Sequence, residues 1–176
     1  LERCLVTGNE ANQYAGGTFG GTINNCLITG NVGSYSGGTA NSALKNCTVT
    51  DNTATHASFG CGGAYQGTAY NSIIYYNNGN TPNVSGNFAG FKYICTTNSY
   101  LPASSFAVTN EPSFVNRPGG DYRLVYDSPC IDSGNNAQAA GTPDHDGNPR
   151  LQNVTVDMGC YEFDPADAPS IPGAWG

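Results

Sequence analysis

The sequence contains few of the residues on which α-helical proteins depend. It has two lysines and one methionine among its 176 residues, and charged residues make up only 11 % of the chain. An average globular domain has about 25 % charged residues. Stable helices draw on Ala, Leu, Glu and Lys, so we do not expect an α-helical fold.

Long apolar runs and clusters of basic residues are also missing. No apolar stretch approaches the roughly 18 residues that a membrane helix needs. The net charge is −7 with only six scattered basic residues, which argues against nucleic acid as a partner. The chain begins at Leu1 without a signal peptide, which favours a processed chain or an excised piece.

The seven cysteines indicate an exported protein in an oxidising environment, at the cell surface or outside the cell. Seven is an odd number, so at least one thiol is free or paired with another chain. The chain has no Cys-x-x-Cys motif, and His56 and His145 are far apart, so we expect no zinc site.

The strongest pattern is a repeat of 21 to 25 residues. Four segments align, at residues 3–9, 25–31, 46–52 and 71–77. The second position of each segment holds Cys4, Cys26, Cys47 or Ser72, and an aliphatic residue follows two places later. All four segments end on an asparagine: Asn9, Asn31, Asn52 and Asn77. Pairs of glycines recur between the segments, at Gly16-Gly17, Gly37-Gly38 and Gly62-Gly63.

This repeat predicts a parallel β-helix. Cysteine and the aliphatic residue alternate with a period of two, so each segment is predicted to be a strand near residues 4–7, 26–29, 47–50 and 72–75. Such short strands stack in parallel about 4.8 Å apart. The four asparagines are then expected to form a hydrogen-bonded ladder, and Cys4, Cys26 and Cys47 an inward ladder of buried thiols. We expect the glycine pairs to adopt positive φ at sharp bends.

The predicted fold class is therefore all-β, a right-handed parallel β-helix of about five to seven coils. Residues 1–90 are predicted to form regular coils. Residues 91–163 are predicted to complete and cap the last coils, with disulfides in the cap, and residues 164–176 form a Pro-rich tail.

The repeats resemble those of extracellular right-handed β-helix proteins of bacterial surfaces. The second half, with its motifs at residues 111–115, 120–124, 128–134, 144–150 and 156–163, is similar to the C-terminal end of β-helix proteins that carry the choice-of-anchor type of domain. The resemblance implies a secreted or cell-surface location and no single defined activity. The surface-anchoring signal of such proteins does not follow these motifs here.

Cys130 and Cys160 lie within two of these terminal motifs, which favours a disulfide between them. Cys61 and Cys95 remain as the next candidate pair, although sequence alone does not give the connectivity.

The segment that contains Asp144, Asp146 and Asn148 offers oxygen ligands at alternate positions, a spacing that calcium loops use. The distal glutamate of such a loop is missing. The alternative is a turn in which Asp and Asn bind their own backbone and Arg150 pairs with a carboxylate. Both interpretations stay open at this point.

Several surface features suggest contact with sugars. Six tyrosines are expected on loops or outward positions, where they would stack on sugar rings or shield the coils: Tyr14, Tyr35, Tyr65, Tyr70, Tyr75 and Tyr76.

The glycosylation sequons are at Asn46, Asn83 and Asn153, and in a bacterial protein they would be coincidental.

The composition favours a non-enzymatic extracellular structural or adhesive module. Glu2, Glu10 and Asp51 are the only acidic residues before Glu111, whereas hydrolysis or elimination of a polysaccharide needs paired acids and bases in a cleft. The alternative is a module that binds or degrades polysaccharide. We also expect head-to-tail self-association into a filament, in which the tail or the capped end of one copy covers the bare first strand of the next.

Overall fold

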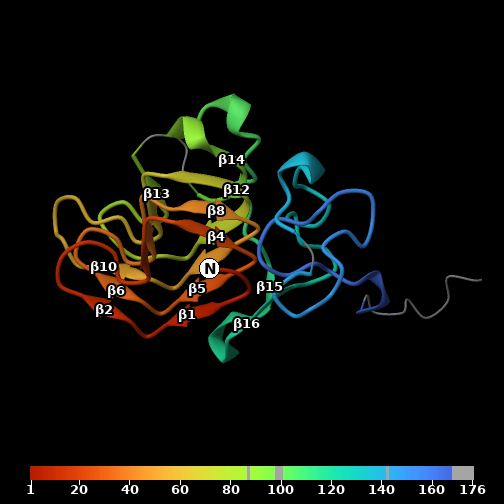
Figure 1. Cartoon of the computed structure of the whole chain (residues 1–176), viewed down its shortest axis with the longest axis horizontal. Helices are drawn as coiled ribbons and strands as arrows, with labels where there is room; N and C mark the ends of the chain where they lie inside the picture. The colour runs from red at the N-terminus through yellow and green to blue at the C-terminus, as the bar shows by residue number, and fades with distance from the viewer. Residues whose placement is uncertain (87, 98–100, 142, 168–176) are drawn as a thin grey trace, which may run out of the picture.

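The computed structural model describes residues 1–86, 88–97, 101–141 and 143–167. The first half of the chain winds into a parallel β-solenoid of about four turns, and an irregular C-terminal lobe lies beside it (Figure 1). The predicted all-β class and parallel β-helix are therefore confirmed. The handedness of the coil stays a prediction.

Parallel strands form three walls of the solenoid. The first sheet consists of β1 (Leu5–Thr7), β4 (Thr22–Asn24), β5 (Leu27–Thr29), β8 (Ala43–Lys45), β9 (Thr48–Thr50), β12 (Thr68–Tyr75) and β14 (Phe91–Cys95). The second sheet contains β2 (Glu10–Ala11), β6 (Val32–Gly33) and β10 (Thr53–Ala54). The third contains β3 (Thr18–Phe19), β7 (Thr39–Ala40), β11 (Ala64–Tyr65) and β13 (Val84–Ser85).

The remaining elements are short. An antiparallel hairpin joins β15 (Phe114–Asn116) to β16 (Asp121–Leu124). The 3-10 helices are η1 (Phe88–Gly90), η2 (Ala103–Ser105), η3 (Arg117–Gly119), η4 (Asn136–Gln138) and η5 (Pro165–Asp167). Within the described part of the chain, no helix has the length and apolar character needed to cross a membrane.

The sequence repeat sets the register of the strands. Leu27 of β5 pairs with Leu5 on one side and with Thr48 on the other, and Thr48 pairs in turn with Ile73. These pairs join equivalent positions of successive repeats. The four predicted strands are present to within one residue at their starts, except that β12 begins earlier, at Thr68.

Each turn of the first wall bends at a residue with left-handed backbone. Asn25, Asn46 and Asn71 occupy this corner, with φ of 49°, 46° and 49°. Asparagine tolerates the left-handed region better than most residues because its short polar side chain can bond locally. The residue that precedes each cysteine or Ser72 in the repeat is therefore a corner residue, arginine (Arg3) in the first repeat and asparagine in the other three.

The glycine pairs serve a different purpose from the one predicted. None of their six residues has a positive φ. Instead, neighbouring coils approach so closely that a Cβ on Gly38 would lie 2.6 Å from the carbonyl oxygen of Gly63 and 2.7 Å from the side chain of Val49. Glycine is needed at these positions for space between coils, and the expected positive φ was wrong.

Apolar side chains fill the interior of the solenoid. Ile23, Leu44 and Phe91 occupy the first part of the first wall, and Ile28 and Val49 the second part, all at 1 % exposure or less. Leu101 and Ala107 pack against this core from the segment after β14. Cys95 forms a bridge with Val108 on that side, so this segment covers the last coil.

The solenoid is shorter than predicted because the chain leaves the coil after β14. The expected five to seven coils are about four, and residues 111–141 and 143–167 form the lobe instead of further coils. The lobe packs against the side of the stack (Figure 1), whereas we expected it to cap the end. The part of the predicted tail at residues 168–176 lies outside the described residues.

Candidate functional site

The four repeat asparagines form one hydrogen-bonded column. The amide Nδ2 of Asn9 donates to Oδ1 of Asn31 at 2.8 Å, Asn31 donates likewise to Asn52 at 2.9 Å, and Asn52 to Asn77 at 3.0 Å. The backbone N–H of each of these three residues also donates to the same oxygen. The column continues to Asn83, whose Oδ1 accepts from Asn77 at 3.2 Å.

The inward cysteines also stack along the coil axis. The backbone N–H of Cys4 donates to Sγ of Cys26 at 3.3 Å, and the Sγ of Cys26 and of Cys47 each donates to the carbonyl two residues earlier. Ser72 continues the pattern, because its hydroxyl accepts from the N–H of Cys47 at 3.1 Å. Burial raises the pKa of the Cys26 and Cys47 thiols, so they remain protonated.

The corner asparagines hold the lobe. Asn25 donates through Nδ2 to the carbonyl of Gly141 at 2.8 Å. Asn46 accepts from the N–H of Ala140 at 2.8 Å, and Asn71 both donates to and accepts from the backbone of Asn135. All three corner residues are fully buried. The sequence contained this signal in the asparagines that precede Cys26, Cys47 and Ser72, but the lobe that they bind has no repeat that would reveal the contact.

Burial also separates the three sequons. Asn46 is fully buried and Asn83 is 4 % exposed, and both side chains are hydrogen-bonded inside the fold. Asn153 is exposed. Within this fold, Asn153 is therefore the one sequon asparagine that a glycan could reach.

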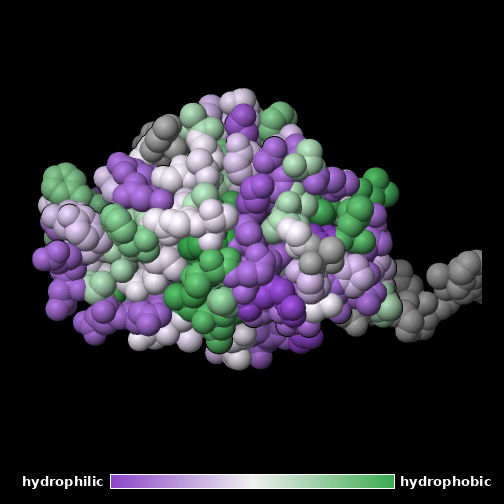
Figure 2. Space-filling model, in the orientation of Figure 1, coloured by the Kyte–Doolittle hydropathy of each residue, from purple (hydrophilic) through white to green (hydrophobic). Residues whose placement is uncertain are grey.

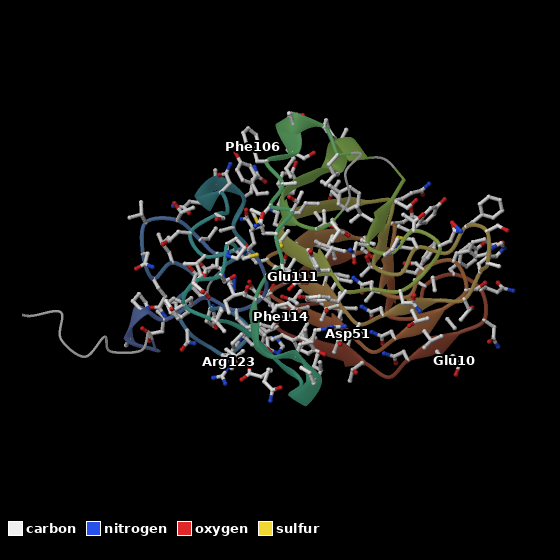
Figure 3. The ribbon with its side chains drawn as sticks, turned by 180° about the vertical axis from the view of Figure 1, so that it is seen from behind. Glu10, Asp51, Phe106, Glu111, Phe114 and Arg123 are labelled. Carbon is white, nitrogen blue, oxygen red and sulfur yellow. The ribbon has the colours of Figure 1, made fainter. Side chains whose placement is uncertain are left out.

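The hairpin of β15 and β16, through Arg117 between its strands, fixes the lobe to the coils at the corner that contains Asp51. The guanidinium of Arg117 forms an ion pair with Asp51 and lies 4.0 Å above the ring of Tyr76. The hydroxyl of Tyr122 contacts both Asp51 at 3.1 Å and the Thr29 hydroxyl at 3.1 Å. Figure 3 shows Asp51 and Phe114 of β15 at this junction.

All seven cysteines are free thiols, so the predicted disulfides are not confirmed. Cys130 and Cys160 belong to separate apolar clusters. The Sγ of Cys61 donates to the carbonyl of Asn83 at 3.7 Å, on the third wall, whereas Cys95 lies at the end of β14 in the first. The expected pairs, Cys130 with Cys160 and Cys61 with Cys95, are therefore not confirmed by this fold.

The predicted calcium segment forms a turn. One carboxylate oxygen of Asp144 accepts from the N–H groups of Gly147 and Asn148, and the other accepts from the N–H of Glu162. Asp146 and Asn148 are exposed. Among the described residues, no group of three His, Cys, Asp or Glu side chains could hold a metal ion. The hydrogen bonds of Asp144 match the turn interpretation, and calcium binding stays a prediction.

Behind this turn, the lobe buries several ionisable groups. Arg150 is 3 % exposed and donates to the carbonyls of Gly159 and Cys160, and it lies 3.7 Å from Glu162. Burial and the neighbouring Asp157 carboxylate raise the pKa of Glu162 to about 8. Burial likewise raises the pKa of Asp157 to about 6. These groups brace the interior of the lobe.

The side of the solenoid away from the lobe carries a row of exposed rings. The ring of Tyr14 lies 5.2 Å from Phe19 and 6.2 Å from Tyr35, between centroids. Tyr35 stacks on His56 at 4.9 Å, and His56 lies 5.3 Å from Phe59. We call these five residues the aromatic strip. Four of them are 41 % to 69 % exposed.

The repeat places the strip. Tyr14, Tyr35 and His56 come from the loops between the second and third walls in three successive coils, so the rings stack as the strands do. These loops lie at the opposite end from the lobe (Figure 1), where Figure 3 also shows Glu10 of β2. Large exposed apolar patches on a folded protein usually mark a binding surface.

A groove of about 330 Å³ lies along the strip. Its lining combines rings with amides: Tyr14, Phe19, Tyr35, Ala40, Asn41, Tyr65 and Gln66. Asn41 and Gln66 are exposed. Apolar walls with a few polar groups, at a volume of roughly 300 Å³ or more, are typical of small-ligand sites.

Five of the six predicted tyrosines fall into two groups, and the sixth, Tyr70, is half-buried in β12. Tyr14, Tyr35 and Tyr65 line the groove. Tyr75 is buried at 7 % exposure, and Tyr76 lies under Arg117 and against Tyr75 with 4.7 Å between ring centroids. Tyr75 and Tyr76 support the lobe, so our expectation of outward positions was wrong for them.

Comparison of the chain with protein-family models, with curated proteins and with solved structures found no match. The resemblance to bacterial surface proteins with a choice-of-anchor domain therefore stays a prediction. What the geometry establishes is the fold: the chain is a parallel β-solenoid of about four turns.

Proposed function

We propose that this protein is a non-enzymatic extracellular module that binds a polysaccharide along its aromatic strip. One observation carries the proposal: exposed rings from three successive coils stack in a row beside a groove that also presents amide groups. Sugar rings have apolar C–H faces that pack on aromatic rings, and hydroxyls that bind amides. A repeating surface suits a repeating ligand.

The lining of the groove supports binding rather than cleavage. Its seven described lining residues are aromatic, amide or alanine side chains, without Asp, Glu, Lys, Arg or His. Hydrolysis of a glycosidic bond uses two positioned carboxyl groups, and elimination needs a base near the sugar. Of these five residue types, the strip contains only His56, which is engaged in ring stacking.

Affinity electrophoresis in gels that contain single polysaccharides tests the proposal. The panel comprises pectin, alginate, xylan, β-glucan and glycosaminoglycans, each with calcium and with a chelator. We expect at least one polysaccharide to retard the protein. The variant Tyr35→Ala should lose most of that retardation, because Tyr35 lies in the middle of the strip.

Tyr126→Ala is the matched control, since Tyr126 is 60 % exposed and lies in the lobe. It should migrate like the unmodified protein. The proposal fails if no polysaccharide retards the chain, or if both variants bind alike. New reducing or unsaturated ends would contradict the non-enzymatic part.

Self-association is a second candidate, favoured by the first coil. Strands β1, β2 and β3 each pair on one side only, and Leu1 and Leu5 are 58 % and 57 % exposed. Figure 2 shows hydrophobic side chains gathered over β1 and β5. Open strand edges pair with other strands. A second copy bound there would raise the mass measured by light scattering with concentration, and Leu5→Lys should lower it. A constant monomer mass would exclude this candidate.

A further inference from the structure

Two thiols meet where the lobe joins the end of the solenoid. Cys95 is the last residue of β14, and Cys130 belongs to the lobe. Both are 0 % exposed and share one apolar cluster with Ile73, Tyr75 and Met158. The neighbouring Cys130 side chain and burial both raise the pKa of the Cys95 thiol, as expected for two thiols that lie next to each other in this cluster.

Backbone contacts hold both residues in place. Cys95 pairs with Ile73 in the first wall, and its Sγ donates to the carbonyl of Asn110 at 3.3 Å. The N–H of Cys130 donates to the Ser128 hydroxyl at 3.2 Å, and its carbonyl accepts from the N–H of Met158 at 3.0 Å. The two side chains therefore approach from separate, fixed elements, which is the arrangement that a structural disulfide bridges.

The other cysteines have different surroundings. Cys26 and Cys47 precede the paired residues Leu27 and Thr48 and so lie one above the other, and residues stacked in this way reach disulfide geometry poorly. The N–H of Cys160 donates to the Thr48 hydroxyl, and Cys61 lies on the third wall beside Asn83. Cys95 and Cys130 are thus the pair that the fold prepares for a bond.

We propose that Cys95 and Cys130 form a disulfide that locks the lobe to the last coil when the chain folds under oxidising conditions. A small-molecule disulfide such as oxidised glutathione is the oxidant. The two thiols lose two electrons and two protons as the Sγ–Sγ bond forms, and the S–S bond of the oxidant breaks to give two thiols that carry those protons. Because both thiols are buried, the exchange takes place during folding or transient opening.

The bond is tested by folding the full chain in a mixture of oxidised and reduced glutathione. The product is denatured and alkylated without reductant. We expect five of the seven cysteines to be alkylated. Trypsin should then release residues 93–123 joined to residues 124–150, and each of these peptides contains a single cysteine. Reduction should separate the two peptides. Reduction of the intact, folded chain should lower its melting temperature by about 5–10 °C.

Two variants complete the test. Cys130→Ser should yield no joined peptides, and Cys61→Ser should keep the pair. The proposal is overturned if all seven thiols of the oxidised, folded chain are alkylated. It is equally overturned if Cys95 carries glutathione or is joined to any cysteine other than Cys130.

Discussion

Replacing Asn52 tests the asparagine column where it is most deeply buried. Asn52 donates through Nδ2 to two backbone carbonyls at 2.9 and 3.0 Å and to Asn77. Its Oδ1 accepts from the N–H of Asn31 and from the Asn31 side chain. Asn52→Ala removes all of these bonds within a site of zero exposure. A buried polar group without a partner costs about 1–3 kcal/mol.

We expect Asn52→Ala to lower the free energy of unfolding by about 3–5 kcal/mol, because at least two buried backbone groups lose a partner without gaining water. Asn9→Ala is the control at the end of the same column, where the side chain is exposed. It should cost about 1 kcal/mol or less. Urea denaturation followed by far-ultraviolet circular dichroism measures both.

Asn52→Asp separates hydrogen bonding from packing. A carboxylate can accept from Asn31 but cannot donate to the two carbonyls, whereas its protonated form regains one donor. The stability of this variant should therefore rise, relative to the unmodified protein, as the pH is lowered toward 4. Equal losses for Asn52→Ala and Asn9→Ala would refute the reasoning, since the column would then contribute nothing beyond surface hydrogen bonds.

Three further changes test the lobe and the coil contacts. Glu162 has a folded pKa near 8, raised by burial, so the folded state holds more protons than the unfolded state between about pH 4.5 and 8. The free energy of unfolding should therefore fall by about 1–3 kcal/mol as the pH rises through this range. In urea titrations, Glu162→Gln should flatten that slope. Asn46→Gly keeps the left-handed corner but removes the hydrogen bonds to the lobe, and should lower the free energy of unfolding by about 2–4 kcal/mol. Asn41→Gly, at an exposed left-handed position, should leave it nearly unchanged in the same assay. Gly38→Ala forces a Cβ against a neighbouring coil and should lower the melting temperature far more than Gly141→Ala, whose Cβ meets nothing within 4 Å and whose φ is not positive. Similar shifts would contradict the close-approach argument.

The repeat made the solenoid predictable. Period-two alternation around each core cysteine, with an asparagine five places later, is enough to align Leu5, Leu27, Thr48 and Ile73 in register. Identical residues then stack, so the hydrogen bonds of the asparagine column follow directly from the sequence. Local pattern and global fold agree in this half of the chain.

The lobe was not predictable in the same way, because its contacts join residues far apart in sequence. Asn46 binds Ala140, and Asp51 binds Arg117, without any period that would announce these pairs. The thiol pair of Cys95 and Cys130 arises only once the lobe folds back beside the coils. Connectivity of this kind is decided by three-dimensional packing and not by spacing.

Only part of the aromatic strip could be predicted from the sequence. Tyr14 and Tyr35 were candidates for sugar contact, but the contributions of Phe19, His56 and Phe59 depend on how the loops stack. Tyr75 could not be told apart from these residues by composition. Its burial follows from the position of the lobe, which no repeat encodes.

Calorimetric titration with oligosaccharides of increasing length tests the central claim most directly, using the polysaccharide that retards the protein in gels. Affinity should rise with length until the ligand spans the rings from Tyr14 to Phe59, and then level off. In the double variant Tyr14→Ala/Tyr35→Ala, affinity should fall at least about tenfold, a loss of about 1.4 kcal/mol. An affinity that does not depend on length, or that the double variant retains, would contradict a polysaccharide site on the aromatic strip.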